Sequence, residues 1–136
     1  MRWILSIPLF AYVVIAANIV MLTGPVDQSM LNVILYELTL PSSRAVVLTI
    51  SDAFILGSLF ILYIEVFKAT RVSTGTQIEH ALSLVVFIVA LIQFLIIPRL
   101  GNVTFLIIML AALMDVVIGF TVTISTAKRD FNFGSG

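Results

Sequence analysis

The sequence predicts an all-α integral membrane protein, built as an antiparallel four-helix transmembrane bundle. Of its 136 residues, 61% are hydrophobic and only 10% are charged, whereas soluble domains carry about 25% charged residues. A chain with so few charges cannot cover a water-facing surface, so its composition favours a lipid bilayer. The formal net charge is +0 and cysteine is absent. These two facts exclude disulfides and thiolate metal sites and give no electrostatic basis for binding nucleic acid.

Four apolar runs meet or nearly meet the length of a transmembrane helix, which needs about 20 residues to cross about 30 Å of hydrocarbon. Lipid cannot satisfy backbone amides, so an open chain crosses it only as helices. A β-barrel would show alternating segments of about 10 residues, and these runs are continuous. The runs cover residues 3–22, 45–67, 81–97 and 103–126 of one domain that includes residues 1–136.

The segment between the first two runs predicts a short amphipathic helix over about residues 28–38. Its apolar residues recur at helical spacing, Asp27 is placed to cap the helix, and Pro41 would prevent the helix from continuing. We expect this helix to lie either on the outer membrane surface or as a lid on the bundle. The apolar positions are Met30, Leu31, Ile34, Leu35 and Leu38.

The placement of Lys and Arg predicts the orientation of the spans. With the N-terminus inside, five basic residues lie on the cytoplasmic side and two, Arg44 and Arg99, lie outside. Positive residues concentrate on the cytoplasmic side of short loops. We therefore expect both termini to be cytoplasmic, in a plasma (inner) membrane. The five are Arg2, Lys68, Arg71, Lys128 and Arg129.

Polar residues inside the predicted spans fall at three depths. Asp52, Asn18 and Gln93 are expected to share a level in the outer third, about 10 Å from the ends of their spans. Asp115 is 13 residues from both Asn102 and Lys128, which places it near the midplane. Glu65 lies close to the inner end, three residues before Lys68, with which it can pair.

Asp115 belongs to a stripe of small and polar residues that repeats every four positions: Ala111, Asp115, Gly119 and Thr123. Small residues at this spacing allow helices to approach closely, so Asp115 is expected to face another helix. One interpretation makes it a structural tie, since interhelical hydrogen bonds contribute on average about 0.6 kcal/mol. The other places it on an ion route, the default hypothesis for an intramembrane acid.

The expected function is that of a non-catalytic accessory or assembly component that acts through partners or self-association. The alternative is an oligomeric proton or cation pathway that uses Asp115 and Asp52. His80, the only histidine, is expected to be solvated or to cap the third span. No nucleophile–base pair or multi-ligand metal site is recognisable, so no catalytic residue, metal or cofactor is expected. The expected partners are the lipid bilayer and further copies of the chain or a larger membrane complex, without nucleic acid.

Overall fold

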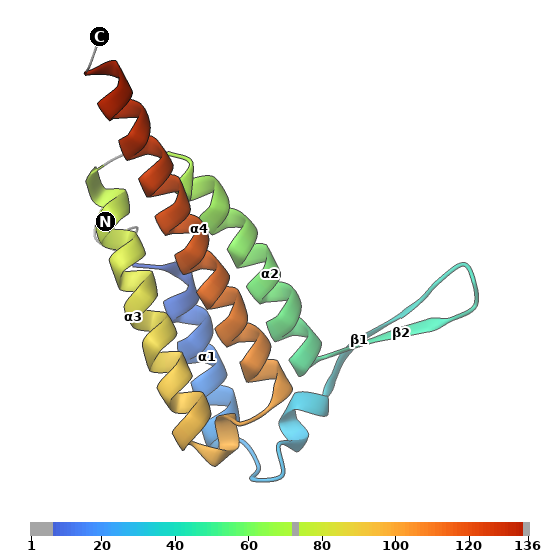
Figure 1. Cartoon of the computed structure of the whole chain (residues 1–136). Helices are drawn as coiled ribbons and strands as arrows, with labels where there is room; N and C mark the ends of the chain where they lie inside the picture. Colours follow the sequence, from blue (N-terminus) through green and yellow to red (C-terminus); the bar gives the residue numbers. More distant parts are fainter. Residues whose placement is uncertain (1–6, 72–73, 135–136) are drawn as a thin grey trace.

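The computed structural model describes residues 7–71 and 74–134, and this part of the chain is mostly helical (Figure 1). Its four α-helices alternate in direction, and α4 packs against both α2 and α3. The helices are α1 (Leu9–Thr23), α2 (Ile50–Ala69), α3 (Thr74–Ile96) and α4 (Val103–Phe133). Two 3-10 turns, η2 (Ser29–Asn32) and η3 (Pro98–Leu100), and two strands, β1 (Ile34–Thr39) and β2 (Ala45–Thr49), lie in the connections.

Among the described residues, three helices are long and apolar enough to cross a membrane, namely α2, α3 and α4. The first helix has 15 residues and is therefore about 22 Å long, shorter than the hydrocarbon layer. The predicted first span began at residue 3, and residues 3–6 lie outside the described part. A fourth crossing therefore remains a prediction. The last helix has 31 residues, and its C-terminal turns project beyond the other helices (Figure 1).

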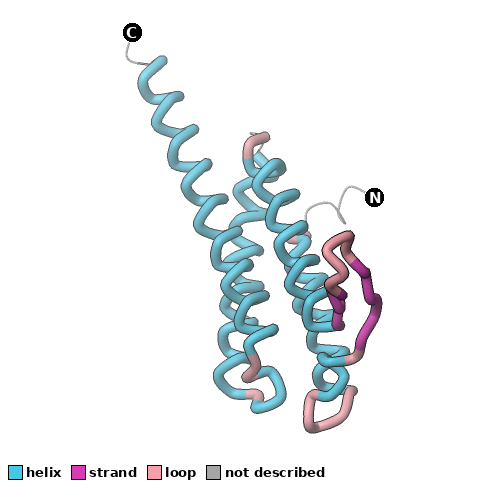
Figure 2. The backbone as a smooth tube through the Cα atoms, turned by 90° about the vertical axis from the view of Figure 1, so that its right-hand side faces the viewer, coloured by secondary structure: helices cyan, strands magenta, loops and turns pink. Residues whose placement is uncertain are grey.

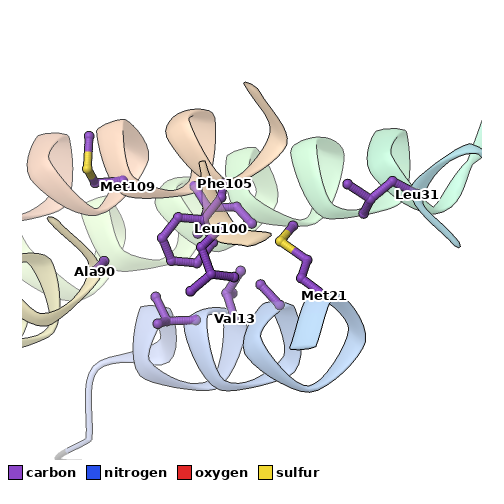
Figure 3. Close-up of a cluster of buried hydrophobic side chains, with 10 residues drawn as sticks. Val13, Met21, Leu31, Ala90, Leu100, Phe105 and Met109 are labelled. Carbon is purple, nitrogen blue, oxygen red and sulfur yellow. The ribbon is translucent and has the colours of Figure 1, made fainter. Parts of the chain in front are cut away.

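An apolar core fills the half of the bundle that lies nearest the connection between α1 and α2 (Figure 3). Leu100, Phe105 and Ile108 are fully buried there, between α1, α3 and α4. In lipid, such cores are held by close van der Waals packing, because lipid tails are as apolar as the side chains. The remaining members are Val13, Val14, Ala17, Met21, Leu31, Ala90 and Met109.

The predicted surface helix over residues 28–38 is wrong. Only η2 is helical there, and the chain then forms an antiparallel hairpin of β1 and β2 that projects from the bundle (Figures 1 and 2). Two cross-strand pairs are Tyr36 with Leu48 and Leu38 with Val46. The β-branched and aromatic residues on both sides of the Pro41–Ser43 loop favour strands, and their pairing across the loop outweighs the helical spacing. Asp27 lies two residues before η2: the Ser29 backbone N–H donates to its carboxylate (3.1 Å) and holds the pKa of Asp27 below its usual value.

The second helix begins at Ile50, five residues after the predicted start of its span, because residues 45–49 belong to β2. Thr49 and Asp52 form a capping box at this end. The Thr49 hydroxyl accepts the Asp52 backbone N–H (3.2 Å), and the Asp52 carboxylate accepts the Thr49 backbone N–H (2.9 Å). These bonds satisfy amides that a helix start leaves without partners.

The end of α1 and the chain before η2 are tied to the turn between α3 and α4. Gln28 Nε2 donates to the Arg99 carbonyl (3.1 Å), and the Arg99 guanidinium donates to the Leu22 carbonyl. Asn102 caps α4 by accepting the Phe105 backbone N–H (2.8 Å). This end of the bundle, which we call the hairpin end, is therefore held together by hydrogen bonds between the α1–α2 and α3–α4 connections.

Candidate functional site

Asn18 and Gln93 meet between α1 and α3, at the common level that the sequence predicts for them. Asn18 Nδ2 donates to Gln93 Oε1 (3.0 Å) and to the Val14 carbonyl (2.8 Å). Both side chains are half-buried. This arrangement is a structural tie between two helices.

Asp52 lies in the first turn of α2, closer to the start of its helix than the sequence-based count assumed. Its carboxylate accepts the backbone N–H (2.9 Å) and the hydroxyl (2.6 Å) of Thr49, in the first turn of α2. The predicted depth was counted along a helix that included residues 45–49, and these residues form β2 instead. The structure therefore gives Asp52 a capping role.

Glu65 lies at the opposite end of α2, where α2 ends and α3 begins, which we call the α2–α3 end. It is only 6% exposed. Its carboxylate accepts the Leu9 backbone N–H (2.7 Å), at the start of α1, and pairs with Lys68 at 3.2 Å. The predicted ion pair is thus present, and the carboxylate also sits at a helix N-terminus, where negative charge is stabilised. Lys68 in turn reaches Glu79 of α3, with 3.7 Å between Nζ and Oε2.

Asp115 is buried between α4 and α3, as its stripe of small residues predicts, and is only 4% exposed. The Ser83 hydroxyl of α3 donates a hydrogen bond to its carboxylate. The second carboxylate oxygen, Oδ2, is buried and has no hydrogen-bond partner among the described residues. A buried polar atom without a partner costs about 1–3 kcal/mol, which makes this oxygen unusual in a folded protein.

His80 is not solvated, contrary to the sequence-based expectation, because it is only 7% exposed. Its imidazole packs directly on Gly119 of α4: a Cβ atom added to that glycine would lie 2.3 Å from His80 Nδ1. Within the described chain, the other ring nitrogen, Nε2, is buried without a hydrogen-bond partner. The absence of a side chain at Gly119 creates the space that the ring occupies.

The association of His80 and Ser83 with Asp115 was not predicted from the sequence. His80 and Ser83 lie three residues apart on one face of α3, and Asp115 and Gly119 lie four apart on one face of α4. The available signal was a glycine one turn after a buried acid, which marks a place where a bulky side chain from a neighbouring helix can enter. The two faces meet because α3 packs against α4.

The resulting polar cluster consists of Glu65, Lys68, Glu79, His80, Ser83 and Asp115. In the ranges 7–71 and 74–134, no group of three or more His, Cys, Asp or Glu side chains has the geometry to hold a metal ion. What the cluster can do chemically is hold and exchange a proton, since it combines an imidazole with carboxylates in a buried setting.

The chain matches no family model, no curated protein and no solved structure. The proposals for its function therefore come from the geometry of the described residues.

Proposed function

We propose that the protein is a non-catalytic membrane component that assembles with further copies of itself through the β-hairpin. The observation that supports this is the exposure of the hairpin: every residue of β1 is exposed, including Tyr36, which is 62% exposed. Leu35 and Val46 are exposed as well. A two-stranded hairpin is marginally stable alone, and three or more strands are needed for independent stability. Association with a second hairpin would supply the additional strands.

Both strands of the hairpin are open edges, and β2 is the less protected of the two. Strand edges are normally protected by charges, prolines or bulges. The first strand carries such protection, because it contains Glu37 and an irregular register between Ile34 and Tyr36. The second strand, Ala45–Thr49, contains no charge and no proline. Two β2 strands paired antiparallel about Val47 would form a four-stranded sheet without placing like charges opposite each other.

The alternative, a proton or cation pathway through Asp115 and Asp52, has weaker support. The Asp52 carboxylate is engaged by Thr49 at the start of α2. Between Asp115 and the hairpin end, α4 contributes the buried residues Phe105, Ile108 and Met109 to the apolar core. Close-packed apolar side chains provide no hydrogen-bonded route for an ion.

The proposed orientation has both termini cytoplasmic in a plasma membrane, because the distribution of Lys and Arg favours it.

Substitution with proline distinguishes the two edges of the hairpin. The Leu40 backbone N–H donates to the Arg44 carbonyl (2.8 Å), and residue pairs alternate in an antiparallel ladder. The backbone groups of Val47 and its partner Glu37 therefore face away from the hairpin. Val47→Pro removes the outward N–H of β2, and Glu37→Pro removes the equivalent group of β1. Proline is tolerated at such edge positions.

The measurement is native mass spectrometry of protein purified in mild detergent. We expect the wild type and Glu37→Pro to be homo-oligomers and Val47→Pro to be monomeric. A monomeric wild type at every concentration, or equal behaviour of the two variants, would contradict the proposal. A different protein bound in stoichiometric amount would show that the hairpin serves a foreign partner instead of a second copy.

A further inference from the structure

Two orphaned polar atoms lie in the same cluster, His80 Nε2 on α3 and Asp115 Oδ2 on α4. Both side chains are more than nine-tenths buried, with 7% and 4% exposure, and neither atom has a partner in the described part of the chain. The first atom, His80 Nε2, is a ring nitrogen that donates a hydrogen bond when protonated and accepts one when not. The second, Asp115 Oδ2, accepts a hydrogen bond when the carboxyl group is ionised. Their chemistry is therefore complementary.

The backbone brings the two groups to adjacent turns. The imidazole of His80 lies against Gly119, which is one helical turn, about 5.4 Å, from Asp115 on the same face of α4. Ser83, one turn after His80 on α3, bonds the Asp115 carboxylate. The histidine and the aspartate thus lie on either side of one closely packed contact between α3 and α4.

Charged groups from α2 and α3 face this contact. The second helix contributes Glu65 and Lys68, and the third contributes Glu79 beside the histidine. From the first helix the Leu9 backbone N–H reaches Glu65. Burial opposes a positive charge on the imidazole, the two carboxylates favour one, and Lys68 opposes it. The side chains of Lys68 and Glu79 are 29% and 20% exposed, so the cluster reaches solvent at the α2–α3 end.

We propose that His80 and Asp115 form a proton-binding site that opens to the α2–α3 end and is closed toward the hairpin end by the apolar core. A hydronium ion at the open end transfers its proton to the free lone pair of the imidazole, which forms an N–H bond and releases water. The imidazolium then donates a hydrogen bond to the Asp115 carboxylate. The proton is released by the reverse transfer to water, and no oxidation or reduction takes place.

The single histidine of the chain makes the site directly observable. The full chain, labelled with ¹⁵N in its histidine and reconstituted in lipid nanodiscs, would show one imidazole in the NMR spectrum, and its shifts would be followed from pH 4 to 9. An opposite charge within about 4–6 Å changes a titration midpoint by about 1–3 pH units. We therefore expect Asp115→Asn to lower the imidazole midpoint by about one unit or more, because the carboxylate no longer stabilises the protonated ring.

Asp130→Asn is the matched control, since it makes the same change at an exposed position of the same helix, about 22 Å further along. It should leave the midpoint unchanged. Equal midpoints in the wild type and Asp115→Asn would overturn the proposal, as would a wild-type imidazole that does not titrate over this range. If Asp115→Asn does not fold, the ¹³C shift of the Asp115 carboxyl group in the wild type decides. If this ¹³C shift changes at the same pH as the shifts of the His80 imidazole, the result supports the site. If it does not change there, the result contradicts the site.

Discussion

Gly119→Ala tests the close contact between α3 and α4. A Cβ atom at this position would lie 2.3 Å from Nδ1, 2.6 Å from Cε1 and 2.7 Å from Cγ of His80. Carbon atoms in contact normally lie about 3.5–4.0 Å apart. The imidazole is buried, so a rotation of the ring would push it against the side chains that surround it. Helix α3 must therefore move away from α4, which also stretches the hydrogen bond from Ser83 to Asp115.

The loss of stability in Gly119→Ala is judged against Gly57→Ala, a glycine-to-alanine change without a clash. A Cβ atom added at Gly57, in the interior of α2, meets no atom within 4 Å. Both substitutions gain the same helix propensity, about 1 kcal/mol, so this contribution cancels between them. Overpacking a well-packed contact costs about 1–3 kcal/mol. We therefore expect Gly119→Ala to be less stable than Gly57→Ala by about 1–3 kcal/mol.

The free energy of unfolding would be measured by circular dichroism during reversible unfolding in mixed micelles, for both variants and the wild type. Adding His80→Ala to Gly119→Ala should recover most of the loss, because the clashing ring is removed and the two positions are coupled. A Gly119→Ala protein as stable as Gly57→Ala would refute the described packing of His80. So would a loss that His80→Ala does not reduce.

Two further predictions concern the capping box and the orientation. Thr49→Ala removes the hydroxyl that accepts the Asp52 N–H and should lower the free energy of unfolding by about 0.5–2 kcal/mol. Thr121→Ala, which removes only an exposed bond to the Val117 carbonyl within α4, should have little effect, and equal losses would argue against the cap. For the orientation, cysteines would be placed in the natively cysteine-free chain at two exposed positions, Ser42 and Thr70. In intact cells a membrane-impermeant thiol reagent should label Ser42→Cys and not Thr70→Cys, and the opposite pattern would reverse the proposed topology.

Local features of the sequence were enough to predict the helical class and the approximate places of α2, α3 and α4, although α3 begins at Thr74, seven residues before the predicted span, and α4 continues to Phe133. Their apolar runs are continuous over about 20 residues, and this property does not depend on any distant part of the chain. The burial of Asp115 was also predictable, because the stripe of small residues around it lies on its own helix. The pairing of Glu65 with Lys68 was predictable for the same reason, since the two residues are three positions apart on α2.

The hairpin was not predictable from local spacing. Residues 30–38 satisfy a helical period and residues 45–49 extend the apolar run of α2, so each segment alone favours helix. Strand formation depends on pairing between the two segments across the Pro41–Ser43 loop, which is a non-local interaction. The same error affected the depth predicted for Asp52, because that depth was counted from Arg44 whereas the helix begins only at Ile50.

The proton-binding pair depends wholly on tertiary structure. Nothing adjacent to His80 in the chain indicates burial, and its neighbours Glu79 and Ala81 suit a solvated helix start. The sequence by itself determined that the chain is apolar and helical, that Asp115 faces another helix and that Gly119 leaves space one turn away. Only the packing of α3 on α4 decided which side chain fills that space, because the space exists on one helix and the imidazole that occupies it comes from another.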